Sequence, residues 1–425
     1  MWHDYCTCLV GYFDSGVGIN MHNSIRATCA MSLALAGLAG PVASSTPPWP
    51  QYRGDRQRTG CASFYATYNP QLAWTYRAGA GCSGSPVVGA NGSVYYGAYD
   101  RHLYAVTSGG SLAWRYLSAG IIVGTPAVGT DGSIYFGTAT GAFYALKSDG
   151  TPKWASPYLI GAQGIPGPVL VGRDGSVYFG ADDSRVYALN PDGTLKWRYL
   201  TGGAIKCGVT SSPDGSVLYA ACSDGLVYAL NASGSLKWKS KIVSPANACA
   251  VGEDGVIYVG GTDCSMYALN PNGTQKWAYR AFGRITTPAA IGRDGAIYFA
   301  SADNTLYGLN SNGSLRWTKP TRDVVYSAPV AEMDGQLIYG TGTGHLISVR
   351  VDDGSTRWDR TAGSCIYTSP ALGWDGSIFS LDTQGLLAKF SGPVNPEPSS
   401  LAALGGGLLC AALAARRARR NRRRA

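Results

Sequence analysis

A tryptophan recurs along this 425-residue chain at intervals of 39 to 43 residues, and an Asn-Gly or Asp-Gly pair recurs in phase with it. A period of about forty residues that also carries strand signals indicates the blades of a β-propeller. The tryptophans of the series are Trp74, Trp114, Trp154, Trp197, Trp238, Trp277, Trp317 and Trp358. The spacing therefore predicts an all-β, eight-bladed propeller.

Each repeat contains four short apolar segments. In residues 167–200 they are "PVLVG", "VYFG", "RVYAL" and "LKWRYL", and the last of them carries the tryptophan. The Asp-Gly pair between the first two is a strong hairpin signal, because both central positions of the tight turn need positive φ. We therefore expect four-stranded antiparallel blades.

The two ends of the repeat array are offset by one strand. The last repeat stops at "FSGPVNPEP" before any Trp strand, whereas the first Trp strand, "QLAWTYRAG" at 71–79, has no three strands before it. We expect this N-terminal strand to complete the last blade, because closing the ring removes open sheet edges. The predicted propeller spans 46–392, and its tryptophans are expected to pack between blades and to give their N–H groups to backbone acceptors.

Residues 1–45 are interpreted as an N-terminal extension and a signal peptide. Within 21–45, Arg26 precedes an apolar run at 27–39 and small residues at 42–44. This is the layout of a secretory signal. The first twenty residues fit no such layout, so Met21 is an alternative start. The pattern predicts export and a helical signal segment.

The C-terminal residues 393–425 contain three parts in order: the triplet Pro396, Glu397 and Pro398, an apolar stretch at 401–415, and seven arginines in the last ten residues. The apolar stretch is short for a stable membrane span, which needs about 17–25 residues. The tail resembles the PEP-CTERM sorting signal. That resemblance implies a second helical segment, transient membrane anchoring, removal by an exosortase-type protease, and a location at the cell surface, in the outer envelope or outside the cell.

The net charge of +9 comes mostly from this tail. Between residues 41 and 400 there are 27 Lys and Arg against 24 Asp and Glu. A nucleic-acid-binding protein would cluster its basic residues on the folded domain. We therefore expect no nucleic-acid partner.

The phrase "ALNPDGTLKW" at 188–197 returns as "ALNASGSLKW", "ALNPNGTQKW" and "GLNSNGSLRW". These residues resemble the PQQ-like propeller repeat family and its Trp-docking motif, and "WPQYRGDRQRTG" at 49–60 resembles the leading segment of exported members. The resemblance covers about residues 49–392. Its motifs are specific for the fold and say little about activity, which depends on the site.

Quinoprotein dehydrogenases of this family imply a quinone, PQQ, on the axis, stacked on a disulfide between adjacent cysteines and bound to Ca²⁺. This chain has no adjacent cysteine pair, and Glu253 and Glu332 are the only glutamates of the predicted propeller. We expect no catalytic residue, no metal and no cofactor. A PQQ-dependent dehydrogenase and a BamB-like outer-membrane protein assembly factor remain as alternatives, although no lipobox-type cysteine follows the signal.

Other residue groups are interpreted as structural. His102 and His345 occupy turn positions without the partners that a catalytic triad or a zinc site requires. "GAGCSG" at 79–84 precedes a strand and lacks the helix that would bind phosphate. Asx turns explain the recurring acids Asp100, Asp182, Asp183, Asp224, Asp263 and Asp303, which are too sparse for Ca²⁺.

Seven cysteines lie between the two end segments, and export would permit disulfides. Cys207 and Cys222 are symmetric about the 214–215 turn, so we expect them opposite each other on one hairpin. Cys82 and Cys365 occupy similar positions in neighbouring blades, which makes a second pairing a hypothesis.

The loops that lead from each Trp strand to the next blade gather at one mouth of the axis. Four of them carry the polar residues Gln163, Lys206, Asn247 and Arg284, which could bind an anionic ligand or a glycan. The alternative is that they are solvated loop residues. The sequence thus predicts an exported, non-enzymatic binding or scaffold protein for a protein or polysaccharide partner.

Overall fold

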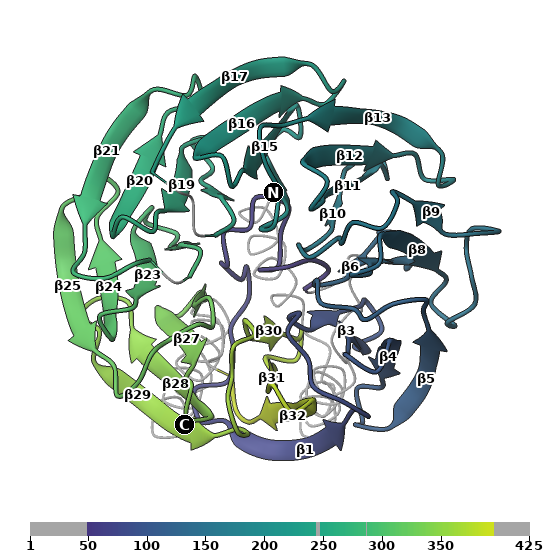
Figure 1. The fold of residues 1–425 in the computed structure, drawn as a ribbon. Helices are drawn as coiled ribbons and strands as arrows, with labels where there is room; N and C mark the ends of the chain where they lie inside the picture. Colours follow the sequence, from purple (N-terminus) through teal and green to yellow (C-terminus); the bar gives the residue numbers. More distant parts are fainter. Residues whose placement is uncertain (1–48, 244–246, 286, 395–425) are drawn as a thin grey trace, which may run out of the picture. The chain divides into compact units, whose positions relative to one another are not determined.

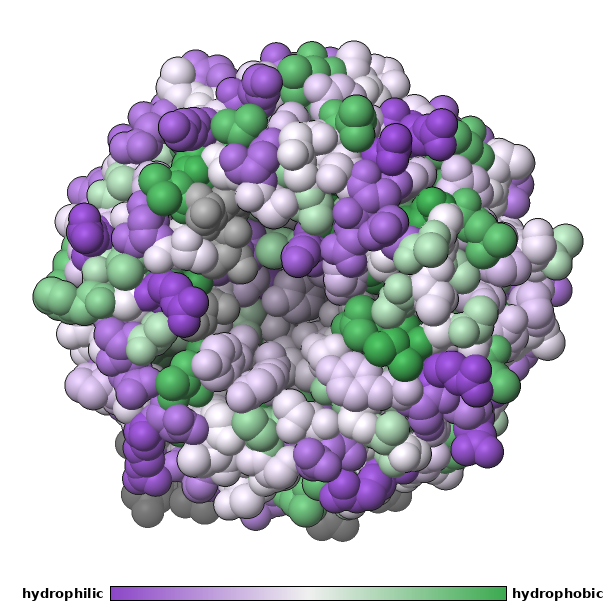
Figure 2. Space-filling model, in the orientation of Figure 1, coloured by the Kyte–Doolittle hydropathy of each residue, from purple (hydrophilic) through white to green (hydrophobic). Residues whose placement is uncertain are grey.

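The structure, a computed structural model, describes residues 49–243, 247–285 and 287–394. In these residues, 32 strands form eight antiparallel sheets of four, arranged as a ring (Figure 1). In the same orientation, the face in view is hollowed at its centre (Figure 2). The prediction of an eight-bladed propeller is therefore confirmed.

The two predicted helical signal segments and the sorting triplet Pro396, Glu397 and Pro398 lie outside the described residues. Within the described ranges, the structure contains no helix with the length and apolarity needed to cross a membrane.

The strands follow the order expected from the repeat. Blades one to four consist of β2 (Val87–Val88), β3 (Val94–Gly97), β4 (His102–Val106), β5 (Leu112–Leu117); β6 (Ala127–Val128), β7 (Ile134–Gly137), β8 (Ala142–Leu146), β9 (Tyr158–Leu159); β10 (Leu170–Val171), β11 (Val177–Gly180), β12 (Arg185–Leu189), β13 (Leu195–Leu200); and β14 (Val209–Ser211), β15 (Val217–Ala221), β16 (Leu226–Asn231), β17 (Leu236–Lys241).

Blades five to eight consist of β18 (Ala250–Val251), β19 (Ile257–Gly260), β20 (Ser265–Leu269), β21 (Gln275–Arg280); β22 (Ala290–Ile291), β23 (Ile297–Ser301), β24 (Thr305–Leu309), β25 (Leu315–Pro320); β26 (Val330–Ala331), β27 (Gln336–Gly340), β28 (His345–Arg350), β29 (Thr356–Thr361); and β30 (Ala371–Leu372), β31 (Ile378–Leu381), β32 (Leu386–Ser391), β1 (Gln71–Arg77).

The N-terminal strand closes the ring as predicted. Strand β1 pairs antiparallel with β32, from Gln71 opposite Ser391 to Arg77 opposite Leu386. The eighth blade therefore takes three strands from the end of the repeat array and one from its start.

Burial differs between the inner and outer strands for a simple reason. The second strand of each blade is buried at every position, because neighbouring blades cover both of its faces. The outer strands β5, β13 and β21 alternate between exposed and half-buried residues, because only one face meets the neighbouring blade. The hydrophobic core thus lies between blades.

The second blade departs from the predicted pattern. Its outer strand β9 contains only two residues, and Trp154 lies before the strand. Pro152 and Pro157 flank this tryptophan, and proline has no N–H group to give to a sheet. The interval from Trp154 to Trp197 is also the longest of the series.

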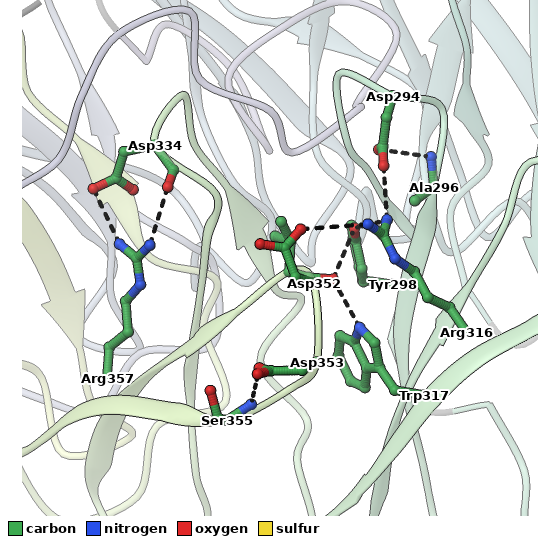
Figure 3. Close-up of polar contacts among 11 residues, drawn as sticks. Asp294, Ala296, Tyr298, Arg316, Trp317, Asp334, Asp352, Asp353, Ser355 and Arg357 are labelled. Carbon is green, nitrogen blue, oxygen red and sulfur yellow. Dashed lines mark hydrogen bonds and ion pairs between the residues drawn. The ribbon is translucent and has the colours of Figure 1, made fainter.

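The blade tryptophans join neighbouring blades. Seven donate their Nε1–H group to a carbonyl oxygen in the turn before the outer strand of the next blade, at 2.7 to 3.0 Å. Each ring also covers a glycine of that turn, where a Cβ would lie only 2.6 to 2.9 Å from the ring. Trp317, which donates to the Val351 carbonyl, is shown in Figure 3.

Trp358 is the exception, because the next blade is the eighth, which the pairing of β1 with β32 closes (the closing seam). The eighth blade has no such turn, since its outer strand β1 comes from the other end of the chain. Trp358 instead donates to Oε1 of Gln336 in its own blade, at 2.9 Å.

The residue before the tryptophan forms an ion pair within its blade. Lys153, Lys196, Lys276 and Arg316 lie 2.7 to 3.8 Å from the aspartate of the first turn, 22 residues earlier in each case. Arg316 also reaches Asp352 of the next blade, and Arg357 pairs with Asp334 (Figure 3). The repeated Asp-Gly and Lys-Trp pairs of the sequence therefore meet in space.

Candidate functional site

The segment 49–62, here called the axial seal, lies against the inner strands of the ring and is drawn in purple near its centre (Figure 1). Its carbonyl oxygens accept backbone N–H groups from six blades at 2.7 to 3.0 Å: Val88 to Trp49, Val128 to Pro50, Ser211 to Arg56, Val251 to Gln57, Ile291 to Thr59 and Ala331 to Gly60. The seal thus satisfies inner-strand donors that no neighbouring strand covers.

The third blade meets the seal through side chains. Oε1 of Gln51 accepts the Val171 N–H at 3.0 Å, and Nε of Arg56 donates to the Val171 carbonyl at 2.9 Å. The seal therefore contacts every blade from the first to the seventh. Residues 49–60 resemble the leading segment of exported family members. In this structure they lie across the axis as part of the seal.

Two arginines of the seal point into the ring and are almost completely buried. Arg53 is 0% exposed and donates through Nη2 to the carbonyls of Thr59 and Pro329. Arg58 is 1% exposed and donates to the carbonyls of Cys207 and Pro168 at 2.8 and 3.2 Å. Burial lowers the pKa of both guanidinium groups to about 10. Sequence reasoning missed both residues, because nothing in a single segment shows which strands it will cross.

The outer side of the seal borders a basin of about 930 Å³. The residues Arg56, Arg173, Glu253, Asp254, Arg293 and Asp294 bring charges of both signs to its wall, and Phe64 and Trp374 add an aromatic pair with centroids 4.9 Å apart. The mixed charges do not select one class of ligand.

The loops from each outer strand to the next inner strand form the opposite face of the ring, here called the loop face. Gln163, Lys206 and Arg284 are exposed on it, and their binding of a ligand stays a prediction. Asn247 is different, because it is only 5% exposed. Its Nδ2 donates to the Ile285 carbonyl and its Oδ1 accepts the Gly260 N–H, both at 3.3 Å. The structure therefore uses Asn247 to hold neighbouring blades together.

The loop face also carries large apolar side chains that the sequence reasoning did not single out. Phe282 is 93% exposed, and Tyr326 and Tyr367 are 44% and 47% exposed with ring centroids 4.6 Å apart. Ile121 and Val243 lie on equivalent loops and are also exposed. Exposed aromatic residues gathered on one face mark surfaces that bind other molecules.

Repeated Tyr–Asp hydrogen bonds hold the edge of this face. Tyr104, Tyr187, Tyr228, Tyr267 and Tyr307 each donate to the aspartate four residues earlier, at 2.5 to 2.7 Å. Four of these aspartates also accept a backbone N–H two residues ahead, as expected for Asx turns: Asp100, Asp183, Asp224 and Asp263. Asp303 instead accepts the N–H of Phe282. Burial and the aspartate together raise the pKa of Tyr228 to about 12. The spacing D-x-x-x-Y was the signal for these pairs.

The residues present do not fit a calcium-bound quinone. The described part of the chain contains no group of three or more His, Cys, Asp and Glu that could hold a metal ion. Glu253 is exposed on a turn, and Glu332 is buried and bonded to the Ala66 N–H. The axis carries the guanidinium groups of Arg53 and Arg58, which would repel a cation.

Neither predicted disulfide is formed among the described residues. Cys222 packs between the third and fourth blades and contacts the Gly203 carbonyl. Gly208 has φ +73°, which turns the chain just before β14, so Cys207 leaves the hairpin and lies near Arg58 and Cys249. For the second pairing, Ile366 and not Cys365 is the counterpart of the buried Cys82, so the two thiols are one position out of phase.

The fold and the seal define an eight-bladed propeller of the PQQ-like class. A family model described as "Outer membrane protein assembly factor BamB" matches residues 118–249 and 223–366, which together exceed half of the chain. The chain belongs to this family.

Solved structures show the same fold at low sequence identity. A europium-containing methanol dehydrogenase is 14% identical with a TM-score of 0.69, covering 82% of this chain and 98% of that chain. BamB from Moraxella catarrhalis is 15% identical with a TM-score of 0.64, covering 76% and 100%. Quinohemoprotein alcohol dehydrogenase from Comamonas testosteroni is 14% identical with a TM-score of 0.68, covering 87% and 85%. No curated protein matches the chain.

Proposed function

We propose that this chain is an exported, non-enzymatic propeller of the cell envelope that binds a protein partner through its loop face. The observation that carries the proposal is the gathering of exposed aromatic and apolar side chains on that face, with Phe282 at 93% exposure. A single exposed hydrophobic residue is normal on a soluble protein, whereas a set on one face indicates an interface.

Charge on the same loops favours a partner with acidic groups. Lys206 and Arg284 are exposed there, and the Arg322 side chain is 79% exposed. Basic residues around apolar anchors raise the rate of association with an acidic surface. Membership of a family described by an outer membrane assembly factor supports an envelope location.

Site-specific crosslinking tests this proposal. A photoreactive residue at Phe282 in the full chain, expressed in its native envelope, is expected to capture one discrete protein. The matched control is Leu72, which is 56% exposed and is the second residue of β1, away from the loop face. Capture of a polysaccharide, or equal products from both positions, would contradict a protein-binding loop face.

The C-terminal tail fits a sorting role in the same proposal. The Pro396, Glu397 and Pro398 triplet would direct an exosortase-type protease to remove the anchor after export. Replacing Glu397 with Ala is expected to leave the tail attached, which the intact mass of the exported protein would reveal. If the tail were still removed from the Glu397→Ala variant, the result would contradict the sorting role of the triplet.

Catalysis is the alternative that must be tested separately. Adding PQQ and Ca²⁺ to the purified full chain is expected to give no bound chromophore after gel filtration. Stoichiometric retention of the quinone would contradict the non-enzymatic proposal and support the dehydrogenase alternative.

A further inference from the structure

The C-terminal tail starts from the end of the ring that carries the basin. The last described residues are Pro393 and Val394, and the Pro393 carbonyl accepts the Tyr68 N–H at 3.2 Å and the Thr67 hydroxyl at 3.0 Å. Val394 forms a bridge with Thr67 and packs on the turn at Gly376, where a Cβ would collide with it. This turn joins β30 to β31 beside the basin wall, so the tail starts opposite the loop face.

Exposed apolar side chains surround this point. Trp374, Tyr68 and Val394 are 38%, 45% and 39% exposed. Phe64 packs against Trp374 with ring centroids 4.9 Å apart. Trp374 lies two residues before Gly376, on which Val394 packs, and the Tyr68 backbone is bonded beside Val394. Phe64, Tyr68, Trp374 and Val394 therefore form one surface, here called the exit patch.

The repeat shows that this apolar character is local. The residue before the Asn-Gly or Asp-Gly pair is apolar in blades seven, eight and one, where it is Met333, Trp374 and Ala90. In blades two to six the same position is occupied by Thr130, Arg173, Pro213, Glu253 and Arg293. The apolar sector is therefore centred on the blade from which the tail starts.

The tail supplies a second apolar element close to the exit patch. In the proposed function the apolar stretch at 401–415 is the membrane anchor. Leu401 follows Val394 by seven residues, so the chain between them spans at most about 25 Å. An anchor inserted in a bilayer therefore keeps the exit patch near the membrane surface.

Charge at the same end of the ring favours anionic lipids. Two acids of the basin wall are neutralised within their own blades, Asp254 by Lys276 and Asp294 by Arg316. The arginines of the wall that belong to none of the ion pairs in the described ranges are Arg56, Arg173 and Arg293. Basic residues near a membrane surface are attracted to anionic headgroups.

We propose that the exit patch contacts the membrane surface while the tail is anchored, so that the loop face points away from the bilayer. Trp and Tyr are enriched at membrane interfaces, because their rings are apolar and their N–H or O–H groups remain in contact with water. The tether raises the effective concentration of the patch at the bilayer, so a few side chains suffice. The inference rests on the anchoring role of the tail in the proposed function and does not depend on the loop-face partner.

Lipid crosslinking of the full chain tests this orientation. The purified chain is reconstituted into vesicles of phosphatidylethanolamine and phosphatidylglycerol, and flotation shows whether it is anchored. A photoreactive aromatic residue at Trp374 is expected to form lipid adducts, detected by mass spectrometry. The matched control is the same residue at Phe282, which is 93% exposed on the loop face and is expected to form none.

The two readouts separate this inference from the anchor itself. A chain that does not float with the vesicles would contradict the anchoring role of the tail and remove the inference with it. A chain that floats but gives no lipid adduct from Trp374, or equal adducts from both positions, would overturn the contact and leave the anchor intact. A crosslink between two chains at Trp374 would also overturn it, because a second copy would then cover the patch.

A weakened anchor gives a second measurement. Leu408→Arg places a charge in the apolar stretch and is expected to lower the fraction of the chain that floats. In this background, Trp374→Ser is expected to lower that fraction further, because the exit patch adds to binding. Phe282→Ser is expected to leave it unchanged. Equal flotation of the three chains would contradict a contribution from the exit patch.

Discussion

At the residue scale, the pKa of the Glu332 carboxyl depends strongly on its surroundings. It is 4% exposed, accepts the Ala66 N–H and lies beside Asp334 and Gln336. Burial, followed by the hydrogen bond and charge of Asp334, raises the pKa of Glu332 to about 10. At neutral pH this group is therefore a protonated acid in the folded chain and an ionised one in the unfolded chain.

A pH dependence of stability follows from this difference. Below the ordinary glutamate pKa of about 4.3, both states hold the proton and Glu332 costs nothing. Between that pH and about 10 the folded chain binds more protons than the unfolded chain, so stability falls by up to about 1.4 kcal/mol per pH unit. Glu332→Gln is expected to flatten this fall between pH 6 and 9, measured by denaturant unfolding. A slope equal to that of the original chain would contradict the assignment.

At the scale of the element, neighbouring blades are joined by the contact of one tryptophan ring with one turn of the next blade. Trp197 donates to the Ala232 carbonyl at 2.9 Å and covers Gly234. Trp358 at the seam is 5% exposed and bonds to a buried amide instead. Both positions are tryptophan, but Trp197 bonds to the next blade, whereas Trp358 bonds within its own blade.

Replacing each of these tryptophans with phenylalanine separates the two joints. Trp197→Phe loses one hydrogen bond at a half-exposed position, and we expect a loss of about 1 kcal/mol in unfolding free energy. Trp358→Phe leaves a gap at a buried position and weakens the satisfaction of Gln336, so a loss of about 2–3 kcal/mol is expected. Chemical denaturation measures both, and equal losses would mean that the seam joint has no special role.

The elements were largely predictable from the sequence, whereas their side-chain environments were not. Asp-Gly turns and the Trp period act within one repeat, and both predicted the strands and blade count. Asn247 and Cys207 were misjudged as a ligand-binding residue and a disulfide partner. Their contacts depend on the neighbouring blade and on the turn at Gly208, which no local pattern reveals. The arginines of the seal were missed for the same reason.

At the scale of the whole molecule, the ring is held by the pairing of β1 with β32. Gln71 and Ser391 lie opposite each other at one end of this pairing. A disulfide between Gln71→Cys and Ser391→Cys would link the two ends of the propeller. Because such a bond closes a loop of several hundred residues, it is expected to stabilise the chain by about 5 kcal/mol on the entropy argument.

The matched control joins Arg185→Cys to Leu200→Cys, which occupy the same type of strand pair inside the third blade. That bond closes a short loop and is expected to contribute about 3 kcal/mol. Thermal unfolding of the oxidised and reduced forms compares the two, after mass spectrometry has verified each bond. A hairpin bond as stabilising as the seam bond would show that ring closure is not what limits unfolding.

The position of the axial seal sets the order in which this protein can mature. The segment is synthesised before any blade, yet its binding positions extend to Ala331 and the partner of β1 ends at Ser391. The first part of the propeller to leave the ribosome is therefore the last to reach its final place. The last contacts of the seal wait for the seventh blade and β1 waits for the eighth, so part of this leading stretch has no partner while the blades between form.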